Sequence, residues 1–99
     1  MIMPVRQFPQ APNSPTITSK AILSGADWIY YVSHDEDGVW QFHGYGGPAP
    51  EAAAAVVALS TIVALDASVS SLSTLPAGWC AWRNSPSSAW QRAARATQP

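Results

Sequence analysis

The chain has 99 residues, of which 47% are apolar and 11% are charged, and its formal net charge is −1. A chain of this length forms one small domain with a single core. The charge balance excludes both the basic excess that neutralises nucleic-acid phosphates and the acidic excess of a nucleic-acid mimic.

Cysteine usage and apolar runs bear on the cellular compartment. Cys80 is the single cysteine, so no internal disulfide can form, and residues 1–15 contain no apolar core of a secretory signal. The longest apolar run, Ala52–Leu65, is shorter than the ~20 residues that a membrane helix needs. The sequence therefore predicts a cytoplasmic protein without a membrane segment.

The first segment is rich in proline. Each proline removes a backbone donor and pushes the preceding residue toward extended geometry, so residues 1–15 are predicted to form an extended, mobile arm. Residues 16–93 are predicted to form one domain. At its start, residues 16–19 favour a short strand, and Ser19 is a candidate N-cap for a helical turn that ends near Gly25.

Two runs rich in aromatic and β-branched residues, 28–33 and 39–45, flank the acidic sequence DEDG and predict a β-hairpin. If Asp37 and Gly38 alone form the turn, each face of the hairpin mixes polar and aromatic side chains. If Glu36, Asp37 and Gly38 form a type I turn with a G1 bulge at the glycine, the two kinds of side chain separate. The three-residue loop is therefore predicted.

In this register His34 lies opposite Trp40, and Val32 lies opposite Phe42. One face then carries Trp28, Tyr30, Val32, His34, Trp40 and Phe42, and the other carries Ile29, Tyr31, Ser33, Gln41 and His43. The first face is predicted to contact the core, because it is the more apolar of the two.

The segment PEAAAAVVALSTIVALDASVSSL is ambiguous by periodicity. Its run of alanines favours the start of a helix, whereas the two valines that follow favour a buried strand. Ser60 and Asp66 are both candidate N-caps, so we expect a strand near residues 55–59 and then two short helical turns. One helix over residues 51–65 remains the open alternative.

A second hairpin is predicted near the C-terminus, where Gly78–Arg83 and Ala89–Arg92 flank the turn-rich sequence NSPSS. Alternation places Trp79, Ala81 and Arg83 on one face and Cys80 with Trp82 on the other. Residues 94–99 are predicted to form a frayed tail.

A zinc site or a nucleophilic centre needs histidine or cysteine side chains, and the candidates here are His34, His43 and Cys80. In the predicted register the two histidines point to opposite faces, so they should not share a metal ion. The acidic loop has part of the spacing of a calcium loop but carries Ser33 and Gly44 where the first and last ligands belong. No catalytic residue, metal or cofactor is therefore predicted, and a small metal-dependent hydrolase using His34, His43 and Cys80 is the alternative.

Aromatic and basic residues near the C-terminus raise a second alternative, a weak single-stranded nucleic-acid binder. Its candidate residues are Trp82, Arg83, Trp90 and Arg92. Because these cations do not continue into a longer basic stripe, nucleic acid is not the favoured partner.

The aromatic content indicates a protein partner instead. Five tryptophans and three tyrosines are more large aromatic residues than a small core usually buries, and Tyr and Trp anchor protein interfaces. The residues predicted to contact the partner occupy the acidic turn and the more polar hairpin face: Tyr31, Asp35, Glu36, Asp37, His43 and Tyr45. The acidic turn would steer a basic partner. The oligomeric state is left open.

Two blocks, HDEDGVWQF and LPAGWCAWR, carry a resemblance that extends roughly from Thr18 to Arg92. Their order resembles a family of short bacterial proteins of unassigned function, similar to the immunity-protein-like domains that accompany polymorphic toxins. The chain departs from that pattern in its alanine run, residues 52–55, and at Ala67, where a proline would suit the helix start. No catalytic residues carry over.

The resemblance implies an α+β domain and a non-enzymatic protein that binds and neutralises a toxin from a neighbouring gene. The hairpin patterns favour the same fold class, an antiparallel sheet of hairpins packed on one or two short helices. We therefore expect an immunity-type protein-binding module that occludes the active site of a cognate toxin.

Overall fold

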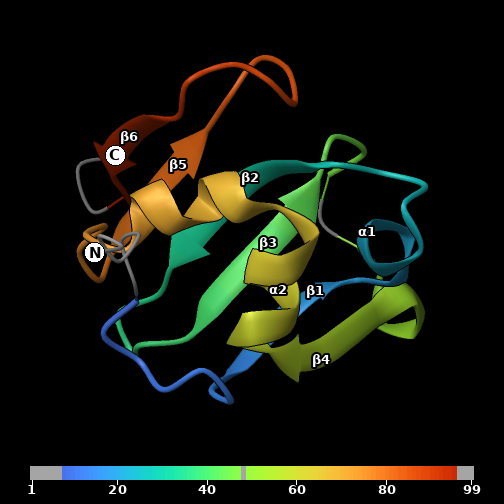
Figure 1. Cartoon of the computed structure of the whole chain (residues 1–99), viewed down its shortest axis with the longest axis horizontal. Coiled ribbons are helices and arrows are strands. Elements are labelled where there is room, and N and C mark those ends of the chain that lie inside the picture. Colours follow the sequence, from blue (N-terminus) through green and yellow to red (C-terminus); the bar gives the residue numbers. More distant parts are fainter. Residues whose placement is uncertain (1–7, 48, 96–99) are drawn as a thin grey trace, which may run out of the picture.

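The computed structural model describes residues 8–47 and 49–95, which form a six-stranded sheet with short helices (Figure 1). In chain order the elements are β1 (Pro15–Ser19), α1 (Lys20–Ser24), β2 (Ile29–His34), β3 (Trp40–Gly44), the 3₁₀ helix η1 (Glu51–Ala53), β4 (Ala54–Ala58), α2 (Leu59–Leu65), the 3₁₀ helix η2 (Ala67–Leu72), β5 (Trp79–Trp82) and β6 (Gln91–Ala94). The strand order is β4-β1-β3-β2-β5-β6, with β1 and β3 parallel and the other neighbours antiparallel. The predicted α+β class is confirmed.

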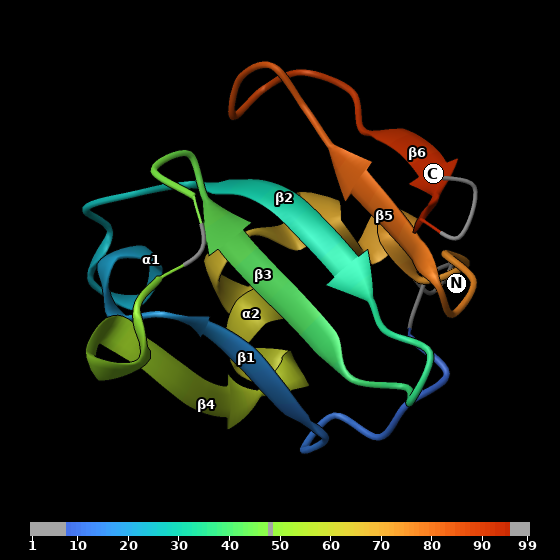
Figure 2. The ribbon, with the colours of Figure 1, turned by 180° about the vertical axis from the view of Figure 1, so that it is seen from behind.

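The two faces of the sheet differ in what covers them. α2 and η2 lie across one face (Figure 1), and buried residues of both layers form one apolar core: Ile22, Ile29, Val32, Trp40, Phe42, Leu59, Ile62, Val69, Leu72, Leu75 and Ala81. From behind, Figure 2 shows β3, β2 and β5 in front of these helices, and no helix of the described residues covers this side. We call it the open face. None of the helices within residues 8–47 and 49–95 is long and apolar enough to cross a membrane.

The first strand and helix form where the sequence predicts them. The Ser19 hydroxyl accepts a hydrogen bond from the Ile22 N–H at 3.1 Å and caps α1, and Gly25 ends the helix with a left-handed φ of 84°. β1 begins at Pro15, one residue earlier than predicted.

The described part of the predicted arm contacts the domain. The Phe8 ring packs edge-to-face on Trp40 with centroids 4.9 Å apart, and the Ser14 carbonyl accepts a hydrogen bond from the Leu59 N–H at 2.9 Å. Residues 8–14 are therefore held by the core and by the start of α2. The rest of the predicted arm, residues 1–7, and most of the predicted tail lie outside the described residues.

The register predicted for the first hairpin is confirmed. His34 pairs with Trp40 and Val32 with Phe42. The turn closes with a hydrogen bond of 2.9 Å from the Gly38 N–H to the Asp35 carbonyl, and Gly38 has a φ of 93°. A residue with a side chain would be strained at that φ, so the glycine fixes the three-residue loop and hence which side chains reach the open face.

At the other end of this hairpin the prediction for Ile29 is wrong. A bulge between Ile29 and Tyr31 shifts the register, so Ile29 lies opposite Gly44 and is buried in the core rather than placed with Tyr31. Tyr30 is the extra residue, and its ring lies against Trp28, with the two planes almost perpendicular.

The ambiguous middle segment is a strand followed by helices, so the alternative of one helix over residues 51–65 is excluded. β4 pairs along its whole length with β1, and this pairing overrides the helical preference of alanine. Asp66 caps η2 by accepting a hydrogen bond from the Ser68 N–H at 3.0 Å, as expected. Ser60 is not a cap, because α2 begins one residue earlier, at Leu59.

The second hairpin also forms, but its second strand, β6, spans Gln91–Ala94 rather than the predicted 89–92, so Ala94 belongs to the sheet and not to the predicted tail. β5 pairs with β6 from Trp79 opposite Ala94 to Trp82 opposite Gln91. Ala81 and Arg83 are buried on the helical side, and Trp82 lies on the open face, as the alternation predicts.

Candidate functional site: the open face of the sheet

The open face is built by side chains of alternate residues on neighbouring strands. In one row across the sheet the register aligns Val56, Ile17, Gln41, Ser33, Cys80 and Ala93; in the next it aligns His43, Tyr31, Trp82 and Gln91. The second row places Tyr31 between His43 and Trp82 (strands in Figure 2). Three half-buried rings therefore lie side by side on adjacent strands.

Burial sets the protonation of this row. It is the main cause that raises the pKa of Tyr31 to about 12, and the neighbouring Cys80 thiol adds to the effect. Burial likewise lowers the pKa of His43 below its ordinary 6.5, against the opposing effect of Asp35. Near neutral pH both rings are therefore uncharged, and they present amphipathic surface rather than charge.

A chain of hydrogen bonds links this row to the acidic turn. His43 Nε2–H donates to the Gln41 side-chain oxygen at 3.0 Å, and Gln41 Nε2–H donates to Asp35 at 2.6 Å. The other Asp35 oxygen accepts a hydrogen bond from the Arg95 guanidinium at 2.8 Å and forms an ion pair with it. These contacts fix the orientation of the His43 ring and the position of the Asp35 carboxylate.

The acidic tip, Asp35, Glu36 and Asp37, adjoins one end of the open face. Glu36 and Asp37 are exposed, and Asp37 accepts a hydrogen bond from the Val39 N–H at 3.0 Å. Arg95 is the cation paired with this tip among the described residues, and it pairs with Asp35. The tip therefore carries two uncompensated negative charges at one end of the open face, and the row that contains Gln41 and Ser33 separates it from the aromatic row.

Five of the six predicted contact residues lie on the open face or at the acidic tip, and Tyr45 packs elsewhere, on Trp28. Tyr31 and His43 are on the open face, and Gln41 links His43 to Asp35 of the acidic tip, whereas Tyr45 follows the end of β3 that lies farther from the tip. Its ring is 65% exposed and stacks on Trp28 with centroids 5.5 Å apart. Gly44 pairs with Ile29 at the bulge, and this irregular end of the hairpin takes Tyr45 out of the regular alternation.

His34, His43 and Cys80 do not converge. His34 lies on the helical side, where its ring stacks on Trp40 with centroids 4.0 Å apart and Nδ1–H donates to the Leu75 carbonyl at 2.8 Å. His43 and the buried Cys80 belong to the open face. Within residues 8–47 and 49–95 no three side chains of His, Cys, Asp or Glu are grouped to hold a metal ion.

Arg83, a candidate residue of the nucleic-acid alternative, is 1% exposed and therefore cannot clamp a nucleic acid. Its guanidinium donates to the Ile29 carbonyl, the Ser68 hydroxyl, the Pro86 carbonyl and Asp66. Its Cζ also lies 4.3 Å from the centre of the Trp90 ring. Trp82 faces the other side of the sheet, so the four residues proposed for nucleic acid form no single surface.

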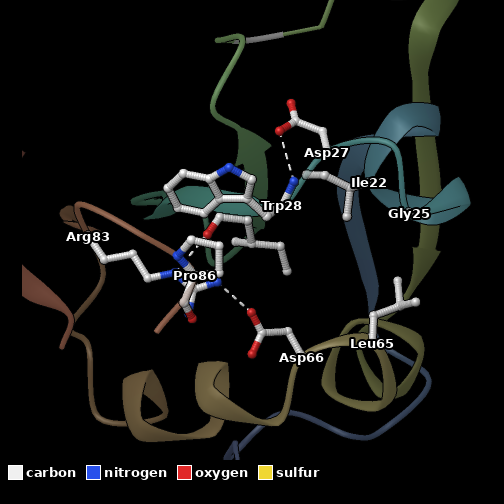
Figure 3. A pocket seen from close by; sticks show the side chains of 9 residues that line it. Ile22, Gly25, Asp27, Trp28, Leu65, Asp66, Arg83 and Pro86 are labelled. Atoms are coloured by element: carbon white, nitrogen blue, oxygen red, sulfur yellow. Dashed lines mark hydrogen bonds and ion pairs between the residues drawn. The ribbon is translucent and has the colours of Figure 1, made fainter. Parts of the chain in front are cut away.

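A cavity of about 180 Å³ lies beside this arginine at the end of the helical layer (Figure 3). Trp28, Leu65 and Pro86 form apolar walls, and Asp66 and Arg83 line its base. Burial would raise the pKa of Asp66, but hydrogen bonds from Ser68 and Arg83 together with the arginine's charge lower it overall. The polar groups of Arg83 are thus already bonded within the chain, which makes this a structural ion pair rather than a ligand-binding group.

Comparisons of the chain with protein-family models, with curated proteins and with solved structures find no match. Function is therefore inferred from the chemistry of the open face and the acidic tip.

Proposed function

We propose that this chain is a non-enzymatic protein-binding module whose open face and acidic tip dock on a basic protein. The observation that carries the proposal is the row formed by His43, Tyr31 and Trp82 on the uncovered side of the sheet. An antiparallel sheet that faces only water usually carries polar side chains there. Tyr and Trp, which expose both apolar area and a hydrogen-bonding group, are the side chains that anchor protein interfaces.

The charge at the tip, on the end of the same sheet face, supports a basic partner. Glu36 and Asp37 project from the tip without an ion pair among the described residues. Such rim charges raise the rate of association with a positively charged surface more than they raise affinity. The aromatic row would supply the buried centre of the interface and the tip would supply its polar rim.

The resemblance to immunity-type domains supplies the identity that we propose for the partner: a toxin encoded by a neighbouring gene. The module would act in the cytoplasm, without a cofactor, by covering the toxin's active site. An unpaired cysteine is compatible with that reducing compartment.

The test measures binding and protection with the neighbouring-gene toxin. Trp82→Ala should weaken binding by about 30-fold or more and abolish protection of cells that express the toxin, because it removes the largest ring of the row. Leu65→Ala is the matched control, since Leu65 is an exposed apolar residue of α2 on the other side of the sheet. Equal binding by wild type and Trp82→Ala would contradict the proposed docking surface.

The acidic tip is tested separately with Glu36→Gln combined with Asp37→Asn. These changes remove charge while Asn keeps an oxygen to accept the Val39 N–H. At low salt the association rate should fall about tenfold with little change in the dissociation rate. An unchanged association rate would exclude steering by the tip.

A further inference from the structure

The two edges of the sheet differ in chemistry. β6 carries Arg92 and is followed by Arg95, and charged side chains discourage an edge from pairing with another strand. β4 has the sequence AAVVA, without charge or proline, and lies at the opposite edge (Figure 2). Its central residue, Val56, is 70% exposed. β4 is therefore the edge suited to pairing.

The hydrogen-bond pattern shows which backbone groups of β4 point outward. The Leu59 N–H donates to the Ser14 carbonyl at 2.9 Å, and these two residues continue the register of the antiparallel β1–β4 pair. Because bonded pairs alternate along such a ladder, residues 55 and 57 bond β1, while residues 54, 56 and 58 direct their backbone groups away from it. The N–H of Ala54 is already used by the Glu51 carbonyl.

We propose that β4 pairs antiparallel with β4 of a second copy of this chain, about a two-fold axis at Val56. Val56 would exchange both backbone hydrogen bonds with Val56 of the second copy, and each Ala58 N–H would donate to the Ala54 carbonyl across the axis. The Ala54–Ala58 segment is self-complementary in this arrangement: Val56 meets Val56, Ala54 meets Ala58, Ala55 meets Val57, and no charge opposes another.

Pairing at β4 would not compete with the proposed toxin-binding surface. β1 and β3 separate β4 from β2, and the acidic tip lies at the β2–β3 turn. The dimer would join the two sheets and continue the row of Ile17 and Val56 into the second copy. Success or failure of this inference is therefore independent of toxin binding.

Sedimentation velocity of the full chain, from micromolar to millimolar concentration, tests the proposal. The wild type should rise from 10.5 kDa toward twice that mass. Val56→Lys should raise the dimer dissociation constant about 100-fold, because it places two like charges opposite each other at the axis. The control is Leu65→Lys, which makes the same charge change on another exposed apolar residue. This variant should dimerise as the wild type does. A wild type that stays monomeric at millimolar concentration, or a Val56→Lys variant that still dimerises, would overturn the proposal.

Amide hydrogen exchange supplies a readout that does not depend on a variant. The N–H groups of Val56 and Ala58 should exchange about tenfold or more slowly at high concentration than at low concentration. A dimer in which these two amides gain no protection would show that another surface pairs, and would also refute the β4 interface.

Discussion

Among the polar side chains, Arg83 is the one whose replacement should lower the free energy of unfolding most. It is 1% exposed and makes four hydrogen bonds through one guanidinium. These bonds join the bulged end of β2, the start of η2 and the 83–90 loop. Arg83→Met keeps most of the apolar stem but leaves the Ile29 carbonyl without the Arg83 donor and Asp66 Oδ2 without its ion-pair partner.

The expected cost follows from the burial of the two partners. Removing one member of a buried ion pair costs about 3–5 kcal/mol, and the Asp66 side chain retains 25% exposure, so water can replace part of what is lost. We expect a loss of about 3 kcal/mol in the free energy of unfolding. For a domain of this size that corresponds to a fall in Tm of roughly 12–24 °C.

Urea unfolding followed by tryptophan fluorescence, together with thermal unfolding, measures this loss. Arg92→Met is the control, because Arg92 is an exposed arginine on the same side and should cost about 0.5 kcal/mol or less. Adding Asp66→Asn to Arg83→Met should restore part of the stability, because it removes the unpaired charge and keeps an oxygen that can accept the Ser68 N–H. A variant Arg83→Met within about 0.5 kcal/mol of the wild type would refute the reasoning about the buried pair.

Two further predictions concern a glycine and a histidine. Gly44→Ala should lower the free energy of unfolding by about 2 kcal/mol or more, because the added Cβ would lie 2.0 Å from Asp27 Oδ2, whereas Gly46→Ala, with that oxygen 3.8 Å away, should cost much less in the same urea titration. Because burial lowers the folded-state pKa of His43 below 6.5, the unfolded chain binds more protons below that pH, so stability should fall as the pH drops from about 7 to 5.5. His43→Gln should flatten this part of the curve in urea unfolding, and a curve that keeps its full slope would contradict the assignment to His43.

The parts of the fold that sequence predicts well are those that depend on neighbours in the chain. The type I turn with its G1 bulge needs Gly38 at one position, and that requirement fixed the register of β2 and β3 and placed Tyr31 and His43 on the open face. The Ser19 cap and the Gly25 helix end are equally local. The candidate site could therefore be located in large part from the hairpin pattern.

The parts that sequence reasoning missed depend on residues far apart in the chain. The bulge at Tyr30 accompanies the burial of Ile29, and no glycine or other turn residue in the local sequence predicts the bulge. Arg83 is buried because Asp66, seventeen positions earlier, comes to lie beside it. An acidic N-cap and an arginine at the end of a strand are both ordinary surface features until the tertiary structure brings them together.

The position of β1 has a consequence for how the chain is made. β1 is the first strand of the described residues, yet it lies inside the sheet, and both of its neighbours, β3 and β4, are synthesised after it. During translation β1 has no strand partner until β3 has left the ribosome, and its second neighbour becomes available only when the strand that ends at Ala58 has followed. Since β4 joins the sheet through β1 alone, deletion of β1 would detach two strands rather than one.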